Sequence, residues 1–545
     1  MTSIVAEQNR RPAWQKRDWI WLALIGLILQ GIWAFSMAHP SYMDAYYYTT
    51  NGRRLADGYG FTEEVIWQYL DNPEGIPTPS HSYWMPLPSM LAAVGHTFTD
   101  RFVGAQLPFW LLAGLLPILT YVISLQFTDE RWQVWAACLF TAVGGYYSRF
   151  LNQPSTFAPF AWTGGLTLLF LAWAHIRHSG KWWLLAGVTT GLAHLTRADG
   201  VLLLGIGGLM WLFEMRDWRL EIGDWKRQLI SNPAAGSGQV LQSPIFHLIL
   251  LLAGYLLIMG GWFWRNWQVM GRPLPTSGTQ TLFLTYYDDI FAYGRTITLS
   301  DYLAWGWLNI LQSKIQGVSM AAQTFIAVSG LIFLGPFIAW AWIKWGRQRE
   351  KWGLLRPLTW YALALFLAMS LVFTWPGQRG GLLHSSAALW TWMMTLAAGG
   401  IGIAVDWVAK RLKHWQPEKA KPIFAGLFVL VALIVSFGTL RHSEEEEPLF
   451  FQQVGEMVPD TAVVMSGNAP AFYYFTGIKS ISVPNEPVDG MLEAAAHFNA
   501  TYLILDENRP RPLAPLYEGA EESPYVEYLG EYFDRFKLYK LYPPE

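Results

Sequence analysis

The chain of 545 residues is rich in apolar side chains and poor in charge. It is 52% hydrophobic and only 14% charged, with 31 tryptophans and a mean hydropathy of +0.21. A soluble globular protein has roughly a quarter of its residues charged, so this composition predicts a polytopic membrane protein. A net charge of −2 without a basic stripe argues against nucleic acid as a partner. The single cysteine, Cys138, excludes intrachain disulfides and cysteine-based zinc sites.

The first apolar segment, Trp19 to Met37, contains no charged residue and is long enough to cross a bilayer as a helix. It is too long for the core of a cleaved signal, and no small-residue cleavage site follows it. The sequence S-Y-M-D-A-Y-Y-Y, residues 41–48, comes next and places Asp44 among four tyrosines. A carboxylate at the membrane surface suits chemistry on a substrate with one polar and one apolar end. The alternative is a helix cap within an aromatic interface belt.

Apolar runs between charged clusters predict eleven membrane helices. The fifth and sixth are short and fit a membrane only if they are tilted or their ends lie elsewhere. The predicted spans are residues 19–38, 104–126, 132–147, 157–175, 182–195, 200–214, 246–264, 318–343, 357–374, 383–408 and 422–440.

The distribution of Arg and Lys predicts the orientation of these spans. With the N-terminus inside, the inner segments contain 21 Arg and Lys residues, against 10 in the outer loops. This bias predicts a cytoplasmic N-terminus and an extracytoplasmic C-terminus. Two outer loops, residues 39–103 and 265–316, are long, so the working surface is expected to face away from the cytoplasm. Near the end of the first loop, Pro86 and Pro88 begin a short apolar stretch that predicts a helix lying in the interface.

The composition changes after Leu440. An acidic run, residues 444–447, indicates a solvated linker. Beyond it, T-A-V-V-M-S and T-Y-L-I-L-D predict two buried strands, separated by the helical pattern M-L-E-A-A-A-H-F. The chain is therefore expected to divide into a membrane domain, residues 1–440, and a small extracytoplasmic α/β domain, residues 441–545. The α/β domain is expected to cover the outer face or to bind a substrate.

Charged residues collect at the predicted outer ends of the helices. Charges at membrane depth are costly, and a functional site is the default hypothesis for them. Four arginines near two carboxylates suit a phosphate-linked substrate, because the planar guanidinium binds phosphate oxygens in a bidentate way. The residues in question are Arg149, Arg197, Arg265, Arg379, Asp44, Asp199 and, beside them, His384.

Each of these residues also has a structural interpretation. An arginine at a helix end can extend to the lipid headgroups or pin two helices by a salt bridge, and Arg197 can simply pair with Asp199. Arg379 favours function, because glycines on both sides leave its approach unobstructed. For His384 and His81, a ligand or general base is weighed against a hydrogen-bonded residue, and the latter is the commoner case.

Four local patterns together resemble the GT-C class of polytopic glycosyltransferases, which includes protein O-mannosyltransferases, the aminoarabinose transferase of lipid A and oligosaccharyltransferases. Within this class the chain is similar to glycosyltransferase family 39. One is the acid after the first helix, Asp44, followed by aromatics and L-A-D-G-Y-G-F. Another is the Pro-rich interfacial segment around Met85-Pro86-Leu87. The others are G-L-A-H-L-T-R-A-D-G, residues 191–200, and W-F-W-R-N-W-Q-V-M-G-R-P, residues 262–273.

The sequence also departs from this family. Many members have two adjacent acids after the first helix, whereas Asp44 is followed by Ala45. A second acid would have to be Glu63, Glu64 or Asp199, so dependence on a divalent metal stays open and no other cofactor is implied. The WWDxG signature of oligosaccharyltransferases is missing, which argues against that subfamily. The adjacent acids 288 and 289 are a weak metal signal and fit a solvated loop edge better.

The resemblance implies transfer of a sugar from a polyprenyl-phosphate-linked donor to an acceptor on the outer face of the membrane. Asp44 would be the general base, and Arg265, Arg379, Arg197 and Arg149 would bind the donor phosphate. It implies inversion at the sugar and leaves open whether the acceptor is a protein, a lipid or a glycan. Asp199, His384, His81, Glu63 and Glu64 would be accessory residues.

Two other functions compete with the transferase. A transporter or lipid flippase predicts charges deep within helices, discontinuous helices at the midplane and two related halves. The sequence has no internal repeat, and its charges lie at helix ends. A non-catalytic assembly factor would leave Asp44 dispensable. The sequence favours the transferase.

The predicted topology can be tested at the C-terminus. Eleven spans and the charge bias place Glu545 outside the cytoplasm. A reporter that is active only in the cytoplasm should therefore be silent when fused after this residue. An active fusion would mean that at least one span is wrong, and the short pair at 182–214 would be the first suspect.

Overall fold

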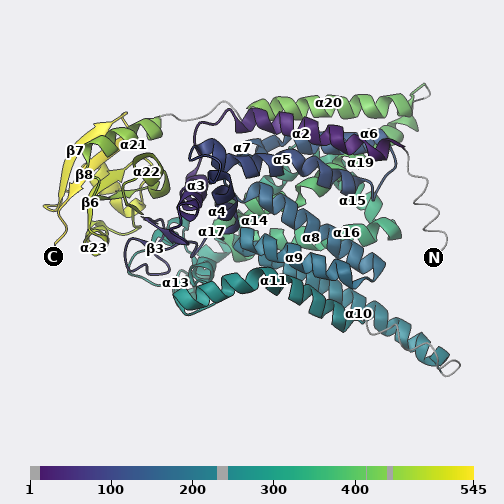
Figure 1. Ribbon diagram of the computed structural model, residues 1–545, viewed down its shortest axis with the longest axis horizontal. Helices are drawn as coiled ribbons and strands as arrows, with labels where there is room; N and C mark the ends of the chain where they lie inside the picture. The colour runs from purple at the N-terminus through teal and green to yellow at the C-terminus, as the bar shows by residue number, and fades with distance from the viewer. Residues whose placement is uncertain (1–12, 230–242, 413, 439–445, 545) are drawn as a thin grey trace.

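The computed structural model describes residues 13–229, 243–412, 414–438 and 446–544. Most of the helices run alongside one another as a bundle, and the strands of the C-terminal segment lie at one end of it (Figure 1). The first helix of the bundle begins at the opposite end. The bundle helices are α2 (Asp18–Ala34), α5 (Phe102–Ser124), α6 (Arg131–Val143), α8 (Phe157–Arg177), α9 (Gly180–Thr196), α10 (Val201–Leu229), α11 (Pro244–Met270), α14 (Trp307–Gly330), α15 (Gly335–Gly346), α16 (Arg349–Leu367), α19 (Trp390–Ala409) and α20 (Pro417–Gly438).

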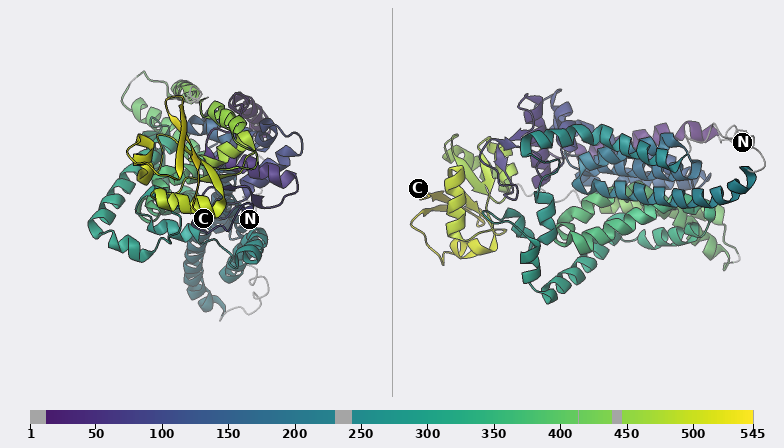
Figure 2. Two further views of the ribbon diagram at one scale, coloured as in Figure 1. Left: turned by 90° about the vertical axis from the view of Figure 1, so that its left-hand side faces the viewer. Right: turned by 90° about the horizontal axis from the view of Figure 1, so that it is seen from below.

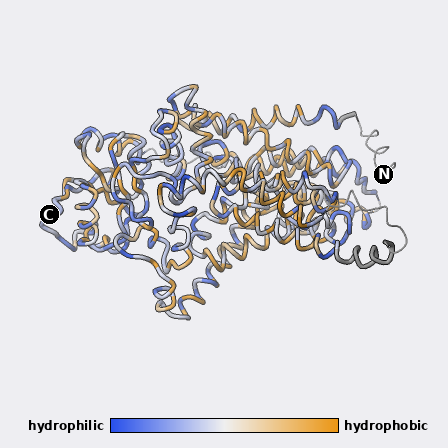
Figure 3. The backbone as a smooth tube through the Cα atoms, turned by 60° about the horizontal axis from the view of Figure 1, so that its bottom comes forward, coloured by the Kyte–Doolittle hydropathy of each residue, from blue (hydrophilic) through white to orange (hydrophobic). Residues whose placement is uncertain are grey.

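The bundle is of the membrane type, as the composition predicts. Among the described residues, seven helices are long and apolar enough to cross a bilayer, or eight if one bent pair is a single span. Hydrophobic residues are concentrated along the bundle in Figure 3. The count of eleven spans stays a prediction, because α2 has only 17 residues and α6 only 13.

Two predicted spans differ from the observed helices. The predicted helix 318–343 is wrong: α14 and α15 meet at a bend of 87°, and Leu331 and Ile332 between them have positive φ. The predicted helix 132–147 ends early, because Gly144 (φ 77°) closes α6 in the left-handed conformation that favours glycine.

Burial separates the helices into a centre and a periphery. The segment Thr374–Ala409 is 94% buried within the protein and that of α8 is 78% buried, whereas the segment of α20 is only 17% buried. Central helices therefore contact protein on all sides, and α20 offers most of its surface to its surroundings. Glycines allow a close approach between α9 and α11: a Cβ on Gly187 would lie 2.1 Å from the carbonyl oxygen of Leu251. Such small-residue contacts are typical of helix packing in membranes.

The two predicted outer loops fold into short elements beside the C-terminal strands (Figures 1 and 2). The first contains the predicted interfacial helix after Pro86, observed as α4. Its elements are α3 (Met43–Ala56), β1 (Thr62–Glu63), β2 (Val65–Ile66), β3 (Thr78–Pro79) and α4 (Leu87–His96). The second contains α12 (Ser277–Gln280), η6 (Thr281–Phe283), η7 (Tyr287–Phe291) and α13 (Leu299–Ala304).

The C-terminal segment supplies five strands of a six-stranded sheet, with helices packed against it. The two strands expected from the sequence are β4 and β6, and they pair in parallel. The elements are α21 (Glu446–Met457), β4 (Val463–Ser466), α22 (Ala469–Thr476), β5 (Ser480–Ser482), α23 (Val488–Phe498), β6 (Ala500–Leu505), η12 (Arg511–Leu513), α24 (Ala514–Glu518), β7 (Val526–Tyr532) and β8 (Phe536–Leu541).

This sheet is not confined to the predicted domain of residues 441–545. Its strand order is β2-β5-β4-β6-β8-β7, so one edge strand comes from the first outer loop. Val65 and Ile66 pair in parallel with Ser480 and Ile481. The division at residue 440 and the extracytoplasmic location of the C-terminal segment stay predictions.

Candidate functional site

Asp44 lies in the first turn of α3, directly after a tightly held turn. Gln153, after the outer end of α7 (Ser148–Leu151), accepts a hydrogen bond from the Ser41 amide (2.9 Å) and donates one to the Ser41 hydroxyl (2.7 Å). The Tyr46 hydroxyl contacts Nδ1 of His39 at 3.0 Å. α2 has already ended at Ala34, and these contacts hold the turn that starts α3 beside α7.

The Asp44 side chain is half-buried and has no carboxylate–arginine ion pair within 4.0 Å among the described residues. Burial raises the pKa of this carboxyl to about 6, although the Arg197 guanidinium opposes the shift. Loss of water disfavours the charged form, while a nearby cation favours it. Asp44 is therefore a stronger base than an ordinary aspartate, and it remains mostly ionised at pH 7.

Arg197 and Asp199 form a bidentate ion pair at the turn between α9 and α10. Nε of Arg197 donates to Oδ1 of Asp199 at 2.9 Å, and Nη2 donates to Oδ2 at 3.3 Å. The third guanidinium nitrogen reaches the hydroxyl of buried Thr156 at 3.4 Å, and that hydroxyl contacts Nδ1 of His384 at 2.8 Å. The hydroxyl of buried Ser385 donates to Asp199. The structural pairing that the sequence allowed is thus present, and it binds the ends of three helical segments together.

Two of the predicted arginines line one cavity of about 640 Å³. Arg149 comes from α7 and Arg379 from the irregular turn η9 (Gly377–Gly381) that precedes α18 (Leu382–Ser385). The amide nitrogen of Gln378 is buried there without a partner among the described residues. The cavity is lined by Tyr146, Arg149, Phe150, Thr324, Ala327, Val328, Gly377, Gln378, Arg379, Gly380 and Leu383.

Glycines shape the turn that presents Arg379. Gly380 has a φ of 119°, which an L side chain rarely adopts. A Cβ on Gly377 would lie 2.0 Å from the carbonyl oxygen of Met369, so only glycine lets the turn pack against the preceding helix. The glycines that flank this arginine in the sequence are therefore required by the backbone as well as leaving its guanidinium accessible.

A tyrosine of the second outer loop connects this cavity to the carboxylate. The Arg379 guanidinium lies 5.0 Å from the ring centre of Tyr287. Burial raises the pKa of Tyr287 to about 12, and the charge of Asp44 contributes to this shift. Burial raises the pKa of Tyr83, from the first outer loop. The charges of Tyr287, Arg197 and Asp44 also act on this pKa. Two tyrosines therefore line the space shared by Asp44, Arg197 and Arg379.

Arg265 binds backbone carbonyl groups of the first outer loop and does not line the cavity of Arg149 and Arg379. Its Nη2 donates to the carbonyl oxygens of Phe61 (3.0 Å) and Ser80 (3.1 Å), which belong to the first outer loop. The guanidinium also lies 4.8 Å from the ring centre of Trp262. The structure does not bring Arg265 to the cavity of Arg149 and Arg379, so the prediction that it contacts donor phosphate has no geometric support.

Three accessory candidates lie around this loop and not beside Asp44. Glu63 is buried near Arg265 and Arg54, and desolvation raises its pKa to about 8, so that it is mostly protonated at pH 7. Buried His81 has hydroxyl partners on both ring nitrogens, Ser80 (2.7 Å) and Ser89 (2.9 Å). Burial lowers the pKa of His81 to about 3, so the ring is neutral.

The third of these, Glu64, joins the loop to the C-terminal segment. It lies 3.5 Å from Arg54 and accepts a hydrogen bond from the Tyr473 hydroxyl at 3.2 Å. Together with Glu63 and His81 it gives the loop a rigid, hydrogen-bonded interior. Of the predicted site residues, the structure thus gathers Asp44, Arg197, Asp199, His384, Arg149 and Arg379, and it places Arg265, Glu63, Glu64 and His81 in a neighbouring loop.

Sequence reasoning missed several residues of this site. Tyr287 lies in T-Y-Y-D-D-I, where the adjacent acids drew attention away from the tyrosines. Tyr83, Thr156 and Ser385 gave no signal at all, because single hydroxyl-bearing residues are common at the ends of membrane helices. Only the structure shows that they meet.

A divalent metal, which the family resemblance left open, does not fit this donor set. Within the described ranges, no three His, Cys, Asp or Glu side chains gather as a metal site requires. Asp199, the nearest other acid, already binds Arg197 and Ser385. We therefore derive no chemical step through a metal.

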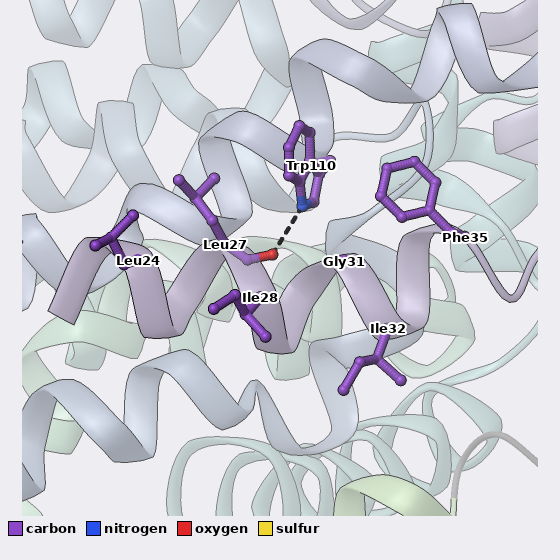
Figure 4. A pocket seen from close by; sticks show the side chains of 7 residues that line it. All are labelled: Leu24, Leu27, Ile28, Gly31, Ile32, Phe35 and Trp110. Carbon is purple, nitrogen blue, oxygen red and sulfur yellow. Dashed lines mark hydrogen bonds between the residues drawn. The ribbon is translucent and has the colours of Figure 1, made fainter. Parts of the chain in front are cut away.

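A second hollow, of about 390 Å³, lies on the side of α2 and contains no charged residue (Figure 4). Trp110 of α5 donates from its indole nitrogen to the carbonyl oxygen of Leu27 at 3.0 Å. The lining is apolar and several of its side chains are exposed, so this hollow suits contact with lipid and lacks the groups for catalysis. It is lined by Leu24, Leu27, Ile28, Gly31, Ile32, Phe35 and Trp110.

Comparison with known proteins supports the fold. No protein-family model and no curated protein sequence matches the chain. The archaeal oligosaccharyltransferase AglB from Archaeoglobus fulgidus, in complex with an inhibitory peptide and a dolichol-phosphate, is 13% identical, with a TM-score of 0.51 over 91% of this chain and 70% of the other. The apo form is 12% identical at the same TM-score, over 90% and 69%.

A further similar structure is ArnT from Cupriavidus metallidurans, which is 13% identical over 95% of this chain and 97% of that one. Its TM-score of 0.40 is too low to support an argument. The chain has the fold of the GT-C polytopic membrane glycosyltransferases, as the local sequence patterns predicted.

The contacts of Arg265 generate a testable prediction. Replacing Arg265 with alanine removes the donor for two loop carbonyls, so residues 61–80 should become more sensitive to proteolysis and the protein should melt at a lower temperature. Lysine should restore only part of the stability, since it lacks the planar fork. Binding of undecaprenyl phosphate by the folded fraction should be unchanged. A selective loss of that binding, with the loop still protected, would instead support a phosphate ligand.

Proposed function

We propose that the protein is an integral membrane glycosyltransferase that moves a sugar from a polyprenyl-phosphate-linked donor to an acceptor on the outer face of the membrane. The observation that carries this proposal is the position of two arginines in one cavity, together with the half-buried carboxylate of Asp44, which has no ion-pair partner among the described residues. The GT-C fold supports it as an analogy of architecture. The sugar and the acceptor are not specified by this geometry.

The cavity of Arg149 and Arg379 is the proposed site for the donor phosphate. Guanidinium groups make strong charge-assisted bonds to phosphate oxygens. The buried amide nitrogen of Gln378, which has no described partner, supplies a further donor. The likeness to AglB, a protein solved in complex with a dolichol-phosphate, is consistent with a polyprenyl-type phosphate as ligand. Arg197, which is held by Asp199, contributes positive potential near the reacting atoms more than a direct phosphate contact.

Asp44 is the proposed general base. Its pKa of about 6 lies just below neutral pH, so it is ionised yet basic enough to accept a proton from the acceptor hydroxyl or amine. The lack of an arginine bound directly to it leaves its oxygens free for the acceptor. As the acceptor attacks the anomeric carbon, negative charge gathers on the departing phosphate, and Arg379 and Arg149 stabilise that charge.

This arrangement leads to inversion at the sugar. With Asp44 activating the acceptor and the arginines holding the phosphate, transfer is a single displacement, in which the acceptor and the leaving group occupy opposite sides of the anomeric carbon. A glycosyl phosphate is already activated, and no acid is needed to protonate its leaving group. Tyr287 and Tyr83 would contact the sugar between them through their aromatic faces.

The transporter alternative finds less support. It requires broken helices at the midplane of the membrane. The break between α14 and α15 lies instead against Gly145, whose added Cβ would be 2.1 Å from Leu331. Gly145 follows the end of α6, at the predicted outer boundary. The break is therefore near the proposed site and not half-way through the bundle.

The role of Asp44 predicts the behaviour of an amide variant. Asp44→Asn should fold and insert normally but lose most of its transfer activity, since an amide cannot accept the proton. Asp57→Asn is the matched control, because this exposed residue directly after α3 has its ion pair with Arg53. Mass spectrometry should find that a deletion strain accumulates lipid-linked sugar and that Asp57→Asn, but not Asp44→Asn, removes it. Full clearance by Asp44→Asn would refute the assignment.

The raised pKa of Asp44 predicts the pH dependence of the rate. The carboxyl gains its proton as the pH falls through about 6, so the fraction of active base halves there and drops about tenfold per further unit. An ordinary aspartate would remain active to about pH 4. The measurement is single-turnover transfer in liposomes between pH 4 and 8. A rate that stays constant down to pH 4.5 would contradict a base with this pKa.

The donor site can be tested by titration with undecaprenyl phosphate in nanodiscs. Arg379→Ala and Arg149→Ala should each lower its affinity tenfold to a hundredfold, about 1.5–3 kcal/mol for a charge-assisted bond. Lysine should recover part of the loss, because it keeps the charge without the bidentate fork. Arg53→Ala, which removes an exposed arginine of α3, is the control. Equal affinity in all of these variants would place the phosphate elsewhere.

A further inference from the structure

In one loop, two adjacent tyrosines each stack against an arginine from another part of the chain. The residues T-Y-Y-D-D, 285–289, lie between the helical bundle and the C-terminal segment. The Arg379 guanidinium, from the bundle, lies 5.0 Å from the ring centre of Tyr287. The Arg511 guanidinium, from η12 of the C-terminal segment, lies 4.0 Å from the ring centre of Tyr286. Two distant parts of the chain thus bring cations to neighbouring residues.

Both guanidinium groups remain available for a ligand. The side chains of Arg379 and Arg511 are exposed, and neither makes a hydrogen bond or an ion pair within 4.0 Å to any residue that the structure describes. Stacking on an aromatic face orients a guanidinium but leaves its N–H edge free. Arg509, two residues before Arg511, behaves differently, since its Nη2 lies 2.7 Å from the Glu518 carboxylate.

The charges of both arginines act on the carboxylate of Asp288. Arg379 and Arg511 each lower its pKa, while burial has the larger, opposite effect. Two cations and one acid leave an excess of positive charge at this place. Because Asp288 is not in ion-pair contact with either arginine, an anionic ligand does not have to break a salt bridge to bind.

The loop that contains the two tyrosines is held in place by hydrogen bonds and ion pairs. Buried Asp289 accepts hydrogen bonds from the Thr285 hydroxyl (2.9 Å) and the Tyr286 amide (3.0 Å). Arg295 bridges Asp289 (3.1 Å) to Glu486 of the C-terminal segment (2.7 Å). Asp289, one of the two adjacent acids that gave the weak metal signal, therefore stabilises the conformation of this loop. It fixes the positions of the tyrosines and limits the entropy lost when a ligand binds.

We propose that Arg379 and Arg511 form a second subsite, on the side of the cavity toward the C-terminal segment, which binds a phosphate group of the substrate. This rests on the proposed function, because Arg379 also faces the donor cavity. The phosphate has two chemical sources. It is either the second phosphate of a diphosphate-linked donor or a phosphate carried by the acceptor. In both cases the C-terminal segment contributes Arg511 directly to substrate binding.

The experiment compares three probes on the full-length protein in nanodiscs. These are undecaprenyl phosphate, undecaprenyl diphosphate, and glycerol 3-phosphate added to protein saturated with undecaprenyl phosphate. Arg511→Ala should leave affinity for undecaprenyl phosphate unchanged and lower affinity for one of the other two probes at least tenfold. Arg511→Lys should recover part of it, and Asp288→Asn should strengthen it by removing a negative charge. Arg509→Ala is the matched control and should change nothing.

The affected probe identifies the source of the phosphate. Loss confined to the diphosphate assigns the subsite to the donor, and loss confined to glycerol 3-phosphate assigns it to the acceptor. Unchanged affinity for both probes in Arg511→Ala would overturn the subsite. So would an equal loss of undecaprenyl phosphate in this variant, since Arg511 would then share the first phosphate. Failure of Arg379→Ala and Arg149→Ala to weaken undecaprenyl phosphate would refute the donor cavity separately.

Discussion

The bidentate ion pair between Arg197 and Asp199 controls the electrostatics at the end of the bundle that lies beside Asp44. A half-buried arginine beside Asp44 would otherwise bind that carboxylate and make it a poor base. Asp199 takes up the guanidinium instead, with Thr156 and Ser385 completing the hydrogen bonds that such a pair needs. Asp44 then feels the positive charge only at a distance, and desolvation determines its pKa.

The Arg197–Asp199 pair also holds several helix ends together. Its partners come from the ends of α8, α9 and the segment before α19, so the charges that tune Asp44 also fix the outer ends of central helices. Arg379 and Arg149 reach their cavity from elements that adjoin the Arg197–Asp199 pair. A membrane protein gains little from burying apolar surface between helices, because lipid is as apolar as a side chain. Polar contacts at helix ends are therefore well suited to fix the position of one helix against another.

The sequence predicted the helices well and their interruptions poorly. Long apolar runs without charge have few alternatives to a helix, because an unsatisfied backbone is too costly in lipid. The break after α14 was not predictable, since Leu331 and Ile332 are apolar residues that ordinarily continue a helix, and only the flanking Gly330 and Gly335 give a hint. Charged site residues were predictable because charge near a membrane is conspicuous. Tyr287 was not, because tyrosine is common at any interface, and the actual contacts of Arg265 depend on loop carbonyls that have no side-chain signature.

The edge strand β2 has a consequence for how the protein matures. Residues 65–66 leave the ribosome long before their partner β5 at residues 480–482 exists. Until the last hundred residues have been synthesised, this strand has unpaired amides and carbonyls, and the first outer loop lacks Tyr473 as a partner for Glu64. The loop that follows Asp44 thus reaches its final form only when translation is nearly complete. A chain that stalls just before residue 480 would contain the helices of the bundle and still lack the strand that pairs with β2.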